Sequence, residues 1–97
     1  MDIPSQSPSL PQLLYAMGDP VRLTILHKLA AAPGGLSCGD LCPETPRSTL
    51  THHLKILRES GLITTAKHGQ THINHLASAG LESHFPGLLP AILRHLG

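Results

Sequence analysis

The stretch from Arg47 to Ile63 constrains the fold of this chain more than any other part of its sequence. Leucines at positions 50, 54 and 57 recur at helical spacing, which predicts a helix with one buried apolar stripe. Gly61 predicts the end of that helix, and the Leu-Ile-Thr-Thr that follows predicts a strand. The face opposite the stripe mixes short hydrogen-bonding side chains with cations: Arg47, Ser48, Thr51, His52 and Lys55. This mixture suits the major groove of DNA, where polar groups meet base edges and cations meet phosphates, and it is equally compatible with a solvated surface.

Length and composition predict a single small domain. The chain has 97 residues and 40% hydrophobic content, and a core of this size buries a modest share of the surface. Tyr15 and Phe85 are its only aromatic residues, so the core must be aliphatic. Such a core gains apolar burial from a second copy of the chain, which favours a dimer.

Charge is distributed unevenly along the chain. The net charge of +1 does not mark a nucleic-acid binder, but the distribution of charge is more informative than its total. Between residues 47 and 75, four cations face one carboxylate, a local charge of +3, from Arg47, Lys55, Arg58 and Lys67 against Glu59. The same segment holds five of the eight histidines, which are His52, His53, His68, His72 and His75.

Several classes of protein do not fit this sequence. No run approaches the ~20 apolar residues that span a bilayer, and Met1-Asp2-Ile3-Pro4 lacks the basic and apolar regions of a signal peptide. Two cysteines four residues apart do not make a secreted disulfide framework, so we expect a cytoplasmic protein. No nucleophile and histidine come with a glycine-rich loop, so we expect no enzyme.

Helix start and stop signals divide the chain into a flexible arm at residues 1–8 and one domain at residues 9–97. A first helix is predicted from Ser9 to Met17 and ends at Gly18. Asp19-Pro20 is a strong start signal for a second helix that stops before Pro33. The inward residues predicted for these two helices are Leu10, Leu13, Leu14 and Met17, then Val21, Ile25, Leu26 and Leu29.

The remaining elements complete a mainly helical pattern. Ser37-Cys38-Gly39-Asp40 fits a capping box and predicts a short third helix, confined by Pro43 and Pro46 before the helix at residues 47–60. Residues 62–66 and 71–76 flank a glycine-containing loop and predict a hairpin. A last helix is predicted over residues 85–96, with Pro90 in its first turn or at a kink. The order α-α-α-α-β-β-α predicts a dimeric winged helix-turn-helix.

Two long segments carry a family resemblance. Residues 18–26, GDPVRLTIL, resemble the "(A/G)DPxRLxIL" signature of ArsR-type (ArsR/SmtB) bacterial repressors. Residues 48–63, STLTHHLKILRESGLI, are similar to that family's "S(T/A)(V/L)SHHLKxLRxAGLI". The resemblance implies a homodimeric winged-helix repressor of a double-stranded DNA operator, with the first and last helices forming the dimer interface. It also implies that a small signal, often a metal ion, sets DNA affinity, and it implies no membrane partner.

The DNA-facing residues follow from the polar helix face and from the resemblance. We expect base or phosphate contacts from Arg47, Ser48, Thr49, Thr51 and His52, and a backbone contact from Lys55. In the hairpin, Gln70 stands where the family has an arginine, so wing contact should be weaker and rest on Lys67, with His68 as a second candidate. The alternative makes Ser48 a helix cap and leaves the other side chains solvated.

Three charged or polar residues near this face have alternative roles. His53 lies beside the buried stripe and is expected to be structural. Arg58 either pairs with Glu59 or Asp40 or touches DNA. Arg22, in the signature of the second helix, has either a structural or a phosphate-binding role.

Candidate sensor residues are of three kinds. Cys38 and Cys42, at spacing i, i+4, would share a helix face, and core packing is favoured over soft-metal binding or thiol oxidation. Glu82, His84 and His95 resemble the family's Zn²⁺ sites, which take ligands from both subunits, but position 98 would have to supply the fourth ligand, so exposed histidines are favoured. His72 and His75 fall on opposite strand faces and do not converge with His68. The eight histidines also suggest DNA binding that depends on pH near neutrality.

Two functions remain in competition at this stage. The favoured one is a sequence-specific dimeric repressor that reads a near-palindromic site with half-sites about one helical turn apart. The other is a winged-helix protein-interaction module without specific DNA binding, which the low net charge and the missing wing arginine support. A near-zero dependence of DNA affinity on salt would favour this second function.

Overall fold

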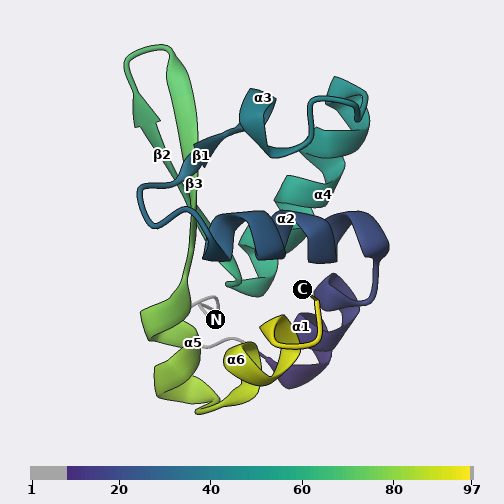
Figure 1. Ribbon diagram of the computed structural model, residues 1–97, viewed down its shortest axis with the longest axis vertical. Helices are drawn as coiled ribbons and strands as arrows, with labels where there is room; N and C mark the ends of the chain where they lie inside the picture. Colours follow the sequence, from purple (N-terminus) through teal and green to yellow (C-terminus); the bar gives the residue numbers. More distant parts are fainter. Residues whose placement is uncertain (1–8, 97) are drawn as a thin grey trace, which may run out of the picture.

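The structure, a computed structural model, describes residues 9–96, so the predicted arm at residues 1–8 lies outside the described part. Its elements follow in the order α1 (Leu10–Met17), α2 (Pro20–Ala30), β1 (Leu36–Ser37), α3 (Cys38–Leu41), α4 (Arg47–Ser60), β2 (Ile63–His68), β3 (Thr71–Leu76), α5 (Ser78–His84) and α6 (Leu88–Leu93). Figure 1 shows α3, the start of α4 and the tip of the β2–β3 hairpin at one end of the molecule. The helices α1, α5 and α6 gather at the other end (Figure 1).

Local capping signals place α2 and α3 where the sequence predicts them. The carboxylate of Asp19 accepts hydrogen bonds from the backbone N–H groups of Val21 and Arg22, at 2.9 and 3.1 Å. Pro20 occupies the first helical position, where its missing N–H costs nothing. The hydroxyl of Ser37 likewise caps α3 by accepting from the backbone N–H of Asp40, at 3.3 Å. Both helix starts are therefore confirmed.

The predicted hairpin is present, and a third strand joins it. The sheet order is β1-β3-β2, all antiparallel, with Leu36 opposite Asn74 and Lys67 opposite His72. Strand β2 reaches His68, so the loop between the strands shortens to Gly69-Gln70. Strand β1 was not predicted because a strand of two residues is too short to show an alternating pattern.

The core lies where α1, α2 and α4 meet. The predicted stripe of α4 is confirmed, since Leu50, Leu54 and Leu57 are all buried. In α1, however, Leu10 and Leu14 are 43% and 52% exposed, which contradicts their predicted inward orientation. The buried residues of α1 are Leu13, Ala16 and Met17. The pattern misled here because α1 has apolar side chains on more than one face, and packing against α2 and α4 selects only one of them.

The prediction of one continuous helix over residues 85–96 is wrong. Within this range only α6 is helical, and Pro86-Gly87 separates it from α5, which ends at His84 before the predicted start. Gly87 adopts a left-handed backbone with φ 83°, which glycine tolerates best. Pro90 lies in the first turn of α6, one of the two placements that its sequence allowed. Helix α5 was missed because Leu81 is its one buried residue, too little for a periodic signal.

The winged helix-turn-helix class is nevertheless confirmed. α3 and α4 are separated by a short turn, and the β2–β3 hairpin follows α4 directly. The observed order adds one strand before α3 and one helix after the hairpin to the predicted order. None of the helices within residues 9–96 has the length and apolar character that a bilayer crossing requires.

Candidate nucleic-acid interface

Every residue of α4 that the sequence assigned to DNA contact has an exposed side chain. These residues are Arg47, Ser48, Thr49, Thr51, His52 and Lys55, and Lys67 in the wing is exposed as well. They share the surface opposite the stripe or its flanks, and the stripe itself anchors α4 to the core. The structure therefore displays the predicted residues together on one side of one helix, with the wing beside it.

Two of these side chains already have partners on the helix surface. The hydroxyl of Thr51 donates to the backbone carbonyl of Arg47 at 2.9 Å, which leaves its oxygen lone pairs to accept a bond. The ammonium of Lys55 lies 3.7 Å from the carboxylate of Glu59, and both side chains are more than half exposed. Because an exposed pair of this kind contributes little, a phosphate can replace the carboxylate at small cost.

The beginning of α4 has no side-chain cap. The helix starts at Arg47, its capping position is Pro46, and no side chain accepts a bond from its first N–H groups. The alternative in which Ser48 caps the helix is therefore wrong, because Ser48 lies inside the first turn. The free N–H groups and the positive end of the helix dipole favour an anion at this end of α4.

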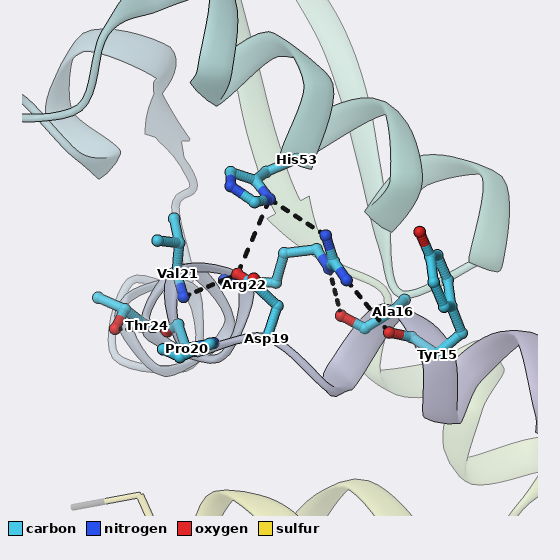
Figure 2. A network of polar contacts seen from close by, with 8 residues as sticks. All are labelled: Tyr15, Ala16, Asp19, Pro20, Val21, Arg22, Thr24 and His53. Carbon is cyan, nitrogen blue, oxygen red and sulfur yellow. Dashed lines mark hydrogen bonds and ion pairs between the residues drawn. The ribbon is translucent and has the colours of Figure 1, made fainter.

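A buried polar network holds the opposite side of α4 against α2 (Figure 2). The guanidinium of Arg22, 6% exposed, donates to the backbone carbonyls of Ala16 at 2.7 Å and Tyr15 at 3.2 Å. Its third partner is Nδ1 of His53, at 3.2 Å, and that nitrogen lies 3.8 Å from the carboxylate of Asp19. Of the two roles weighed for Arg22, the structure supports the structural one, and the structural role expected for His53 is confirmed.

The same network shifts the titration of its carboxylate. Hydrogen bonding by the backbone N–H of Arg22 lowers the pKa of Asp19 below its usual value, and the charge of Arg22 acts in the same direction. Asp19 is therefore an ionised helix cap at neutral pH. The network positions α4 and leaves its exposed face free for a ligand.

Arg58 does not make either of its predicted ion pairs within residues 9–96. Glu59 lies beside Lys55 instead, and the carboxylate of Asp40 accepts a bond from the hydroxyl of Ser37 at 3.0 Å. Arg58 points to a groove between α4 and the wing, which it lines together with Arg47 and His72. His72 was not predicted to face α4, because only the strand pairing decides which wing residues do so.

The two cysteines do not share a helix face, contrary to the prediction. α3 ends at Leu41, and Cys42 has a non-helical backbone with φ −144° and ψ 77°. Cys42 is 3% exposed and belongs to the core, so core packing describes it well. Cys38 is half-buried, with its sulfur 3.6 Å from the amide nitrogen of Asn74.

The predicted zinc ligands do not converge within one chain. Glu82 accepts a bond from the backbone N–H of Gly87 at 3.1 Å, and Nδ1 of His84 lies 2.9 Å from the carbonyl of Gly80. Within residues 9–96 no three histidine, cysteine, aspartate or glutamate side chains lie close enough to hold a metal ion. A Zn²⁺ site built from Glu82, His84 and His95 therefore stays a prediction that would require a second chain.

A helix-turn-helix whose second helix presents a polar, cationic face beside a β-hairpin defines a winged-helix DNA-binding protein. Residues 17–66 match the model of a family described as a helix-turn-helix domain. The regulator YceK of Bacillus subtilis, described as an uncharacterized HTH-type transcriptional regulator, is 31% identical over 83 residues, which cover 84% of this chain and 83% of that protein. An arsenical resistance operon repressor of Staphylococcus xylosus is 36% identical over 74 residues, covering 69% of this chain and 64% of the repressor.

Solved structures agree with these relatives. HlyU of Vibrio cholerae is similar in fold, with a TM-score of 0.73 and 33% sequence identity over 89% of each chain. The chain belongs to the ArsR-type family of winged helix-turn-helix regulators. It is a DNA-binding transcriptional repressor and not an enzyme.

Proposed function

We propose that this repressor works in the cytoplasm as a homodimer and inserts the α4 helix of each subunit into the major groove of its operator. The contacts come from Arg47, Ser48, Thr49, Thr51, His52 and Lys55 of α4 and from Lys67 of the wing. The observation that carries this proposal is that the six side chains of α4 are exposed while the other side of the same helix is buried. Small polar groups on such a helix can reach base edges, and the cations can reach phosphates.

An exposed apolar surface on α1 supports the homodimer. Leu10, Leu14 and Tyr15 are 43%, 52% and 64% exposed, which is costly for three neighbouring large side chains of a small domain. They lie on a helix at the end of the molecule away from α3 and the hairpin tip (Figure 1). The partly buried residues Leu88, Ile92 and Leu93 of α6 occupy the same end (Figure 1). A twofold contact there would leave both α4 helices free for half-sites about one helical turn apart.

The recognition face is tested by its sequence specificity. Operator sites are first selected from a pool of random duplexes with the wild-type protein. The double variant Thr51→Ala/His52→Ala should lose specific binding to the selected site while its melting and its oligomeric state stay unchanged. Losing two base-edge contacts costs about 1–3 kcal/mol each, or roughly 30-fold and more in affinity. If the double variant still prefers the selected site, the recognition face is assigned wrongly.

A matched control exists on α2. Thr24 and His27 are also exposed, and the hydroxyl of Thr24 donates to the carbonyl of Pro20 at 3.0 Å, as Thr51 does to Arg47. The double variant Thr24→Ala/His27→Ala removes the same kinds of side chain away from α4. It should bind the selected site as the wild type does.

The homodimer is tested by sedimentation. The wild type should sediment as a dimer at micromolar concentration, and Leu14→Glu should shift it to the monomer because a carboxylate is costly to bury in an apolar contact. A wild type that sediments as a monomer would refute the proposed assembly.

Release from the operator by a small signal is the last part of the proposal. The candidate residues are Cys38 and Cys42 for a soft metal or an oxidant, and Glu82, His84 and His95 for Zn²⁺. Operator affinity should be measured with zinc, arsenite, peroxide and a chelator in turn. A loss of affinity with arsenite or peroxide that disappears in Cys38→Ser would assign the signal to the thiols, and a zinc effect that disappears in His95→Ala would assign it to the C-terminal residues.

A further inference from the structure

A groove runs between the flank of α4 and the face of the wing. Its volume is about 450 Å³, and its polar lining comes from Arg47, Thr51 and Arg58 of α4 and from Thr65, His72 and Asn74 of the wing, beside Cys38 and Leu54. A second hollow of about 230 Å³ shares Arg47 and His72 with it and continues toward Gln70 at the wing tip. The two hollows form one surface depression beside the helix that meets DNA.

Strand register decides which wing residues face this groove. Thr65 pairs with Asn74 and Lys67 pairs with His72 across the two strands. Directly opposite residues of an antiparallel pair lie on the same face, and residues two apart along a strand share that face. Lys67 and His72 therefore lie on the groove side of the wing, whereas Thr64 and Ala66 lie on the other side.

The two hydroxyls that line the groove have already donated their protons, so its free donors belong to the arginines and His72. The hydroxyl of Thr51 donates to the carbonyl of Arg47, and the hydroxyl of Thr65 donates to the side-chain oxygen of Asn74 at 2.8 Å. Asn74 is fully buried and spends its own amide on the carbonyl of Leu36. The two guanidinium groups and the imidazole of His72 remain, and guanidinium groups are donors only.

No carboxylate lines the groove, and none within residues 9–96 lies at ion-pair distance from Arg47 or Arg58. A cationic groove with donors and without carboxylates fits a ligand that accepts hydrogen bonds and carries negative charge. Arg47 and Arg58 are eleven residues apart on α4, a rise of about 16 Å. Phosphates of one DNA strand are spaced ~3.4 Å apart along the axis of the duplex. The separation of the two arginine positions along α4 therefore spans more than one phosphate.

We propose that this groove binds the phosphodiester backbone of one operator strand, and that His72 supplies the wing's contact to it opposite Arg47 and Arg58. The backbone is the favoured anion because Arg47 and Thr51 belong both to the groove and to the face that reads DNA, so a strand leaving the major groove passes directly into it. The inference rests on the proposed function in one respect: the recognition face of α4 fixes the side from which the DNA strand approaches the groove. Its contacts are to phosphates and carry no sequence information.

The test compares two exposed positions on opposite faces of the wing, His72 and Thr64. Binding of a labelled mixed-sequence duplex of about 30 base pairs, long enough for two half-sites, is measured at several salt concentrations. His72→Glu should weaken binding about tenfold at roughly 0.1 M salt, because the new carboxylate repels the phosphates. Thr64→Glu also adds one carboxylate to the wing and should leave affinity within about twofold.

A second variant tests the helix side of the groove. Arg58→Gln should lower the slope of log affinity against log salt by about one, the value for one lost phosphate contact. Arg94→Gln removes an exposed arginine from the end of α6, at the other end of the molecule, and should leave the slope unchanged. Thermal melting and sedimentation of all four variants should match the wild type.

Three results would overturn the proposal. Equal losses in His72→Glu and Thr64→Glu would show an effect of net charge alone, and an unchanged salt slope in Arg58→Gln would remove the helix side of the contact. Saturable binding of inorganic phosphate at millimolar concentration to the free protein, lost in His72→Glu, would make the groove a pocket for small anions instead. Because the duplex has no defined site, none of these results depends on the residues that read the operator.

Discussion

The guanidinium of Arg22 and the imidazole of His53, 31 residues apart in sequence, join α2 to α4 through a buried hydrogen bond of 3.2 Å (Figure 2). Because a guanidinium only donates, Nδ1 of His53 is the acceptor and its ring is the tautomer protonated at Nε2. Arg22 also holds the last turn of α1 through two carbonyls. One side chain therefore ties together the three helices that position the proposed DNA-binding face.

Removing the guanidinium should destabilise the fold. Arg22→Met leaves the buried carbonyl of Ala16 and the ring nitrogen of His53 without this donor, at a cost of roughly 2–4 kcal/mol. Chemical denaturation should show this loss in the free energy of unfolding. Arg94→Met removes an exposed arginine and should change stability by less than about 0.5 kcal/mol. Equal effects in the two variants would contradict a structural role for Arg22.

The bond between the two helices should appear as coupling in a double-mutant cycle. His53→Leu leaves one N–H of Arg22 unpaired and should cost about 1–3 kcal/mol. The double variant Arg22→Met/His53→Leu should lose roughly 1 kcal/mol less stability than the sum of the losses in the two single variants, because the shared bond is removed only once. Strict additivity of the two single changes would show that the contact contributes nothing to stability.

Asp19 should make stability depend on acidity. Its pKa is lowered in the folded protein, chiefly by the backbone N–H of Arg22, so its contribution is complete above the pKa of the unfolded chain and is lost as pH falls through the folded value. Asp19→Asn keeps the helix cap but removes the charge, and should melt below the wild type at pH 7. This difference should shrink as pH falls below about 4. A difference that is constant from neutral to acid pH would refute the lowered pKa.

Gly35 should not tolerate a side chain. Its φ of +86° is left-handed, and a Cβ there would lie 2.6 Å from both Nε2 of His75 and Cγ2 of Ile73. Gly35→Ala should therefore lower the free energy of unfolding by roughly 2–4 kcal/mol through backbone strain and overpacking against β3. Gly34→Ala is a matched control, because a Cβ at Gly34 meets nothing within 4 Å. The neighbouring alanine should leave stability unchanged or raise it by less than about 1 kcal/mol.

The two thiols should differ in reactivity. Cys38 is half-buried at the surface groove, and Cys42 is in the core. In the native protein an alkylating reagent should modify Cys38 at least about tenfold faster than Cys42, since Cys42 becomes accessible only on unfolding. Mass spectrometry of the digested protein would give both rates, and equal rates would show that the core around Cys42 opens readily.

Several predictions succeeded because their signals are local. The stripe of Leu50, Leu54 and Leu57, the cap at Asp19 and the stop at Gly61 each depend on residues within one or two helical turns. The exposure of the polar side of α4 follows from the same stripe, since burying one side of the helix leaves the other in water. The predicted wing succeeded for a similar reason, because a glycine turn joins two adjacent strands.

By itself the sequence determined the helix-turn-helix, its wing and the polar side of α4, because periodicity and capping act between close neighbours in the chain. Only the tertiary structure decided which face of α1 is buried, where the C-terminal region breaks and how Arg22 meets His53. It also decided that His72 faces Arg47 across the groove. These contacts join residues tens of positions apart, and such pairings leave no periodic trace, because the packing of whole elements selects them after each element has formed.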